Sequence, residues 1–260
     1  MTSSKQDGSK DGGFQGHFAE LLKVEGKLAL REPTGLAMAT GAPIIFLVVF
    51  GLIGIVSPGP VANTGYTVLD LYVPVIMVMI FIFLGIASLP VTMVKYREMG
   101  WLRRFSVTPV PPSRLLAAQL IVNLALAGVA VLIVIFGSEL IFGATLHVSI
   151  LYFVLSLVTS IAVIFSLGLV VAAIAPSQST TTVLTGGLTF LLLFLSGLWL
   201  PPSTIGGLLA TIMYYSPSGA SVQALLYSVF NVTPPFTAII TMVVYAMVFT
   251  FIAIRYFRWE

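Results

Sequence analysis

Long apolar runs, separated by short polar or proline-containing stretches, dominate the pattern of this sequence. A helix of about 20 residues, at about 1.5 Å per residue, crosses the hydrocarbon core of a bilayer, which is about 30 Å thick. Runs of this length predict spans at 35–57, 71–94, 115–136, 149–174, 181–200 and 235–254. The pattern therefore predicts an all-α integral membrane protein with six transmembrane helices within residues 35–255.

The region before the first span has a different pattern. Residues 1–13 lack apolar side chains after Met1 and are expected to form a disordered tail. Residues 14–32 repeat apolar positions at helical spacing, which predicts an amphipathic helix lying in the membrane interface. Its apolar face includes Phe18, Leu21 and Leu22. A plain cytosolic extension of the first span is the alternative. Glu25 falls on the apolar face, either solvated or paired with a basic residue of a neighbouring loop.

The loop at 95–114, between the second and third spans, holds five of the twelve basic residues and three prolines. Residues 96–105 can form a short amphipathic helix, which Thr108-Pro109 would stop. Such a helix, held at the end of a span, can dock into a partner protein. The simpler alternative is a basic loop that only sets topology and touches lipid headgroups.

The segment between the fifth and sixth spans, residues 201–234, carries no charge and is broken by prolines. Helices at roughly 203–213 and 217–230 fit this pattern, and each is too short to span. We expect a re-entrant helical hairpin packed against the spans, since exposed turn backbone in hydrocarbon is unfavourable. Two helices lying on the outer surface are the alternative.

Composition and charge fix the environment and the orientation. Hydrophobic residues make up 58% of the chain and charged residues only 8%, far below the quarter that a soluble domain carries. The twelve basic residues fall before the first span, in the 95–114 loop or after the last span. The positive-inside rule therefore places both termini, including residues 255–260, and this loop in the cytosol.

Several kinds of chemistry have no support in the sequence. There is no cysteine, and the two histidines, His17 and His147, have no acidic partners at ligand spacing, so no metal site is expected. No span carries a charge near its middle, which disfavours an ion-driven pump. The phosphate-binding loop of nucleotide-hydrolysing enzymes is absent, so the chain needs no cofactor of its own and is not predicted to be an enzyme. Energy for transport would have to come from a partner.

Polar side chains inside the spans have two interpretations. The commoner one is hydrogen bonding between helices. The other is the lining of a transport path, for which the candidates are Asn123, Thr182, Thr185, Thr189 and Ser196. The threonines recur at helical spacing, which makes the fifth span the best candidate for a helix at a subunit seam.

The order of residues in the 95–114 loop resembles a family signature. Glu98, Gly100 and Leu102, followed by Thr108-Pro109, are similar to the Glu-x-Gly-x-Leu…Thr-Pro pattern of type-2 ABC exporter permeases. The resemblance implies a coupling helix that binds an ATPase subunit through Arg97, Glu98, Gly100, Trp101, Leu102, Arg103, Arg104, Phe105, Thr108 and Pro109. It also implies that 14–32 is a connecting helix, with Phe18, Leu21, Leu22 and Glu25 near the same ATPase. Trp101 departs from the small or hydroxyl residue that is usual there.

The resemblance recurs after the fifth span and covers most of the chain from about residue 18. Leu195-Ser-Gly-Leu-Trp-Leu-Pro201 and Tyr215-Ser-Pro217 resemble the family's Ser-Gly-x-x-x-Pro…Asn-Pro pattern, with Ser216 in place of Asn. This implies a re-entrant hairpin whose marker residues are Gly197, Pro201, Ser216 and Pro217.

Taken together, the resemblance implies a permease subunit of an ATP-driven exporter in a bacterial cell membrane. Two copies, or this chain and a homologue, would bind separate ATPase subunits, which hold the ATP. The closest branch is the drug and antibiotic efflux type, so a lipophilic substrate is expected. Polysaccharide or lipid export, and a membrane scaffold without transport activity, are the alternatives.

Overall fold

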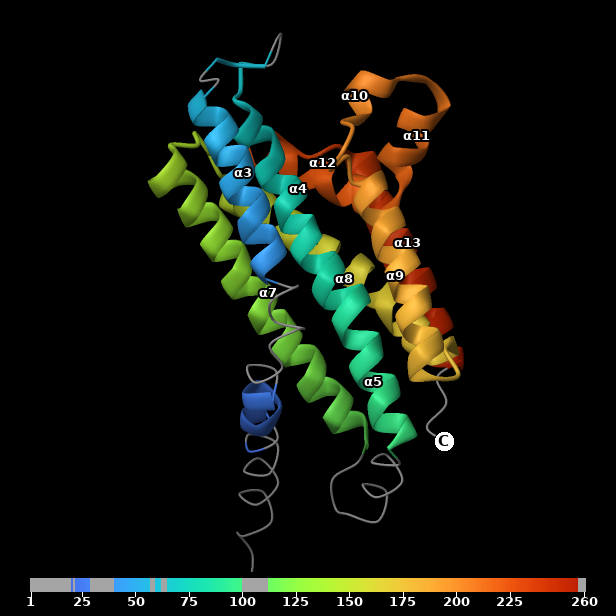
Figure 1. Cartoon of the computed structure of the whole chain (residues 1–260). Coiled ribbons are helices and arrows are strands. Elements are labelled where there is room, and N and C mark those ends of the chain that lie inside the picture. The colour runs from blue at the N-terminus through green and yellow to red at the C-terminus, as the bar shows by residue number, and fades with distance from the viewer. Residues whose placement is uncertain are drawn as a thin grey trace, which may run out of the picture.

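The computed structural model is a bundle of long helices with short helices across one end (Figure 1). It describes residues 20, 22–28, 40–56, 59–61, 65–99 and 112–256, all helical or irregular. The helices are α3 (Ala42–Val56), α4 (Val68–Ile82), the π-helix η2 (Phe83–Ser88), α5 (Leu89–Glu98), α7 (Pro112–Phe142), α8 (Ile150–Ile174), α9 (Gln178–Leu195), α10 (Pro202–Ile205), α11 (Gly207–Tyr215), α12 (Pro217–Val229) and α13 (Phe236–Tyr256).

The central element is the continuous helix α4–η2–α5, which is enclosed by α3, α7, α8, α9 and α12. Side chains from Val73 to Ile82 are almost completely buried around its whole circumference. A helix that is apolar all round is expected at such a position. The predicted span at 71–94 corresponds to a helix from Val68 to Glu98 that is long and apolar enough to cross a membrane.

The π-helix has a local cause in the sequence. Pro90 lacks an N–H, and its ring crowds the carbonyl four residues earlier, so a wider turn relieves the clash. The same turn lets α8 approach the central helix closely. A methyl group at Gly168 would overlap the Gly85 carbonyl oxygen, so this crossing requires glycine at position 168.

The N-terminal end of α4 is fixed by a capping box. Asp70 Oδ2 accepts the Thr67 N–H at 2.9 Å, and Thr67 Oγ1 accepts the Asp70 N–H at 3.3 Å. Asp70 Oδ1 also accepts the N–H of Thr145, at 3.0 Å, from the segment that leads into α8. Asp70 is therefore buried with both oxygens satisfied.

Five helices are long and apolar enough to cross a membrane, within the part of the chain that the structure describes. They are α4–η2–α5, α7, α8, α9 and α13. The first predicted span, 35–57, corresponds to α3, which has 15 residues and is shorter than a bilayer requires. Residues 35–39 lie outside the described part, so the count of six spans stays a prediction.

Two helices have limits that differ from those of the predicted spans. The third span was expected to end at residue 136, but α7 continues to Phe142 and stops where Gly143 adopts a φ of +69°. Gly137 instead packs closely against Leu47. The fifth span was expected at 181–200, whereas α9 begins at Gln178 after the Ser177 cap and ends at Leu195.

The 201–234 segment forms three helices rather than two, because Gly206 at a φ of +67° separates α10 from α11. The helix predicted at 217–230 is confirmed as α12, which packs against α8, α13, α4 and α9. Only α12 is buried deep in the bundle, whereas most of α11 is exposed. This hairpin lies at the end opposite α5 (Figure 1).

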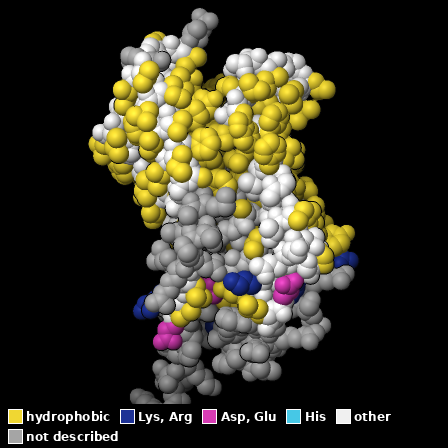
Figure 2. Space-filling view, viewed as in Figure 1, with side chains coloured by type: hydrophobic (Ala, Val, Ile, Leu, Met, Phe, Trp, Pro, Cys, Tyr) yellow, Lys and Arg dark blue, Asp and Glu magenta, His cyan; other side chains and the backbone are white. Residues whose placement is uncertain are grey.

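Hydrophobic side chains cover most of the upper surface in Figure 2, and the charged side chains gather at the lower end. The apolar surface includes exposed large side chains such as Phe136, Val183 and Phe251. A soluble monomer rarely exposes so large an apolar area. The surface therefore suits a multi-pass membrane protein with hydrocarbon around it.

Candidate functional site at the end of α5

The last turn of α5 connects three separate parts of the chain. Consecutive side chains, Tyr96, Arg97 and Glu98, each bind a segment more than 70 residues away. Their partners are Glu25 and the turn of residues 175–178 between α8 and α9. We call this group of contacts the α5 junction.

The first contact anchors the N-terminal helical segment, residues 22–28. The Tyr96 hydroxyl lies 3.2 Å and 3.1 Å from the two carboxylate oxygens of Glu25 and donates to them. Both side chains are buried, with Glu25 only 3% exposed. The expectation of a solvated Glu25 was therefore wrong. A buried carboxylate requires hydrogen bonds, and the tyrosine provides one.

The second and third contacts hold the α8–α9 turn by opposite charges. The Arg97 guanidinium donates to the carbonyl oxygen of Ala175, the C-cap residue that follows α8. Glu98 Oε1 accepts the N–H of Gln178, the first residue of α9, at 2.9 Å. Helix C-termini carry partial negative charge and N-termini partial positive charge. Arg97 and Glu98 therefore match the two helix ends that they contact.

Local sequence explains why the turn sits there. Pro176 disfavours helical backbone at Ala175, which ends α8. Ser177 then caps α9, with its Oγ accepting the Thr180 N–H at 3.3 Å. The sequence analysis did not predict the link between this turn and Arg97. Two helix ends facing a loop with adjacent opposite charges are a signal that could have suggested the link.

The remaining coupling-helix residues, Gly100, Trp101, Leu102, Arg103, Arg104, Phe105, Thr108 and Pro109, lie outside the described residues. The same holds for Phe18 and Leu21 of the predicted connecting helix, and for the 1–13 tail. Leu22 is described and is half-buried. The structure thus brings together Glu25, Arg97 and Glu98 from the predicted site.

The predicted path residues mostly bond within their own helices. Asn123 donates to the Gln119 carbonyl at 2.9 Å, and Ser196 to that of Leu193 at 2.7 Å. Thr182 is exposed, whereas Thr185 is buried and donates to the Thr182 carbonyl. Their transport role stays a prediction.

Thr189 differs from these residues. Its hydroxyl is buried and has no hydrogen-bond partner among the described residues. A hydroxyl in that state is unfavourable in an apolar interior.

The hairpin markers have clear structural roles. Gly197 adopts a φ of +84° just after α9. Pro201 immediately precedes α10. Ser216 caps α12 by accepting the Gly219 N–H at 3.0 Å, and Pro217 is the first residue of that helix. A serine here does what the family's asparagine would do, because both side chains are good helix caps.

Comparison with known protein families gives one match that bears on this site. No curated protein matches the chain. A family model described as ABC-2 type transporter matches residues 17–230, which include the α5 junction and the α12 cap. The match covers more than half of the sequence, so the chain belongs to the ABC-2 type transporter family.

Proposed function

We propose that this chain, a membrane subunit of an ABC transporter by family, works in an ATP-driven exporter. It would pair with a second copy or a homologous permease and bind separate ATPase subunits at the α5 end. The proposed cargo is a lipophilic compound, such as a drug, antibiotic or lipid-like molecule. The cell membrane of a bacterium, with both termini cytosolic, is the proposed location.

The observation that carries the proposal is the α5 junction. The proposed ATPase-binding loop joins α5 to α7, so force on the loop reaches the last turn of α5 first. Tyr96, Arg97 and Glu98 bind the 22–28 segment and the α8–α9 turn. Movement of the loop would therefore displace these elements together.

This geometry assigns different roles within the predicted interface. The side chains of Arg97 and Glu98 bind helix ends of their own chain. We therefore propose that they position the loop, and that Trp101 and Arg104 contact the ATPase. Loss of Arg97 or Glu98 should disturb the coupling of hydrolysis to export more than it disturbs ATPase binding.

Co-purification and vesicle transport test these roles separately. The neighbouring reading frame should encode the ATPase, which is expected to co-purify with this chain and to drive ATP-dependent export from vesicles. Arg104→Glu should reduce the retained ATPase severalfold. Glu98→Ala should retain the ATPase but export less substrate per ATP hydrolysed. Val129→Ala, on the exposed face of α7 and outside the proposed ATPase-binding elements, is the control.

Retention of no ATPase, together with unchanged export in the Glu98 and Arg104 variants, would exclude the proposal. A membrane scaffold would show no ATP-dependent transport at all. A polysaccharide or lipid exporter would transport those cargoes while giving the same coupling results.

A further inference from the structure

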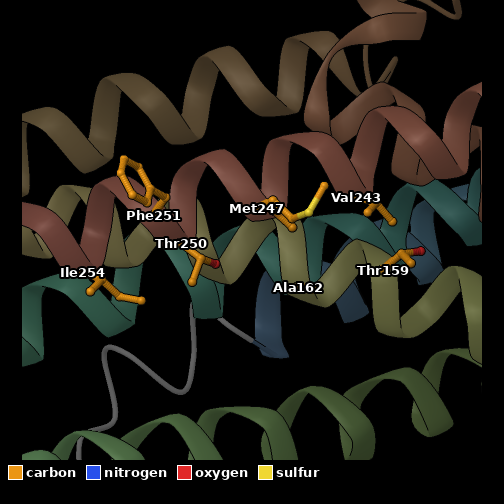
Figure 3. Close-up of a pocket in the computed structure, with 8 residues that line it drawn as sticks. Thr159, Ala162, Val243, Met247, Thr250, Phe251 and Ile254 are labelled. Carbon is orange, nitrogen blue, oxygen red and sulfur yellow. The ribbon is translucent and has the colours of Figure 1, made fainter.

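An apolar groove is lined by α8 and α13 and includes no residue of the α5 junction or of α9. Its volume is about 520 Å³. Thr159 and Ala162 of α8 line it together with Val243, Met247, Thr250 and Ile254 of α13 (Figure 3). The Thr159 hydroxyl donates to the Leu155 carbonyl at 2.8 Å, so it does not require a polar ligand.

The length of the groove matches one leaflet of a bilayer. Val243 and Ile254 mark its two ends in Figure 3 and are eleven residues apart on α13. At about 1.5 Å per residue this is about 16.5 Å, roughly half of a hydrocarbon core of about 30 Å. One end therefore reaches the membrane surface when the other is near the midplane.

The groove is open along one side, and its lining is apolar apart from the hydroxyls of Thr159 and Thr250. A hydrocarbon chain of the surrounding bilayer can therefore lie along it without a polar partner.

A basic residue lies one position beyond the surface end of the groove. Arg255 directly follows Ile254 and is exposed in the last turn of α13. Basic side chains at the cytosolic surface attract anionic lipid headgroups. We propose that the groove holds one acyl chain of an anionic phospholipid of the cytosolic leaflet, with its phosphate at Arg255. The proposal depends on the proposed orientation and not on the cargo or the ATPase.

Photolabelling of the purified full-length protein in vesicles tests this site. The probes are phosphatidylglycerol and phosphatidylcholine that carry the same diazirine-labelled acyl chain, and the labelled peptides are mapped by mass spectrometry. Phosphatidylglycerol should label residues 243–254 severalfold more than phosphatidylcholine does. Arg255→Gln should reduce that preference by about fivefold, which corresponds to one surface charge.

Filling the groove should abolish the labelling. Ala162→Trp places an indole inside it, and Met247→Trp, at a side chain that is 60% exposed, serves if the first variant does not fold. Val129→Trp, on the exposed face of α7, is the matched control and should leave labelling unchanged.

Three results would each overturn the proposal. The first is equal labelling by both lipids, which indicates ordinary annular lipid. The second is crosslinking of α13 to a second copy. The third is an equal loss of labelling in the Val129→Trp control. ATPase retention, measured on the same preparations, shows independently whether the proposed function stands.

Discussion

At the scale of single residues, the α5 junction depends on side chains that face three different partners from one helical turn. Tyr96 is the buried member of the three and binds Glu25 through its hydroxyl. Hydrogen bonds to a charged group contribute more than neutral ones, and a buried group that loses its partner is destabilised further. The contact between Tyr96 and Glu25 should therefore have a measurable effect on stability.

The Tyr96→Phe substitution is expected to lower the stability of the protein by about 1–3 kcal/mol, because the buried Glu25 carboxylate loses a donor. Thermal unfolding in detergent measures the change. Glu25→Gln and the double variant complete the cycle. The two effects should be non-additive, as expected for residues in direct contact. Simple addition would show that the pair is not coupled.

Gly168 is the second residue with a specific requirement, since a side chain there overlaps the Gly85 carbonyl. We expect Gly168→Ala to destabilise the protein by about 1–3 kcal/mol through overpacking. Gly128 of α7 has open space around it, so Gly128→Ala should be neutral or slightly stabilising. Size-exclusion profiles after graded heating compare the two alanine variants, and equal profiles would refute the close helix crossing.

At the scale of elements, the apolar pattern predicted most helices but not all of their ends. Length and hydropathy sufficed for α8 and α13, whose limits differ from the prediction by at most two residues. The end of α7 was missed because Gly137 and Gly143 look alike in the sequence. Only the fold shows that the first packs against Leu47 and the second takes the left-handed turn.

Neither the π-helix nor the contacts of the site could be predicted from the sequence, because both depend on the three-dimensional fold. Pro90 signals a local disturbance of the helix, but the sequence does not say whether it becomes a kink or the π-helix η2. Glu25 could be placed on an apolar face from its spacing, whereas its partner Tyr96 is 71 residues away. The periodicity of a single sequence shows which face a residue lies on, but it does not identify a partner so far away in the chain. The Thr67-x-x-Asp70 capping box was readable and was overlooked.

The start of α12 gives a prediction at this scale. Ser216→Ala removes the cap and should destabilise the protein by about 1 kcal/mol, whereas Ser216→Asn should retain most of the stability. The exposed Ser179 of α9 offers a control, with no loss expected in Ser179→Ala. Thermal unfolding compares the three variants. If Ser216→Asn lowers the stability as much as Ser216→Ala does, helix capping is not the role of this residue.

At the scale of the whole molecule, the proposed pairing of two copies places α9 at the seam. The chain has no cysteine, so single cysteines can be introduced without background. Thr182→Cys, on the exposed face of α9, should form a crosslinked dimer in membranes on mild oxidation. Phe136→Cys, on the exposed face of α7, is the matched control and should remain monomeric. The opposite pattern would place the seam elsewhere.

The contacts of α8 with the central helix have a mechanical consequence. Asp70 binds Thr145 just before α8, Gly85 meets Gly168 within it, and Arg97 binds Ala175 at its end. Fastened at three well-separated points, the two helices have little freedom to slide or swing against each other. We therefore expect the two helices to move as one rigid unit. In the proposed exporter, any movement that opens a transport path would then occur where this unit meets α7 or the proposed second copy.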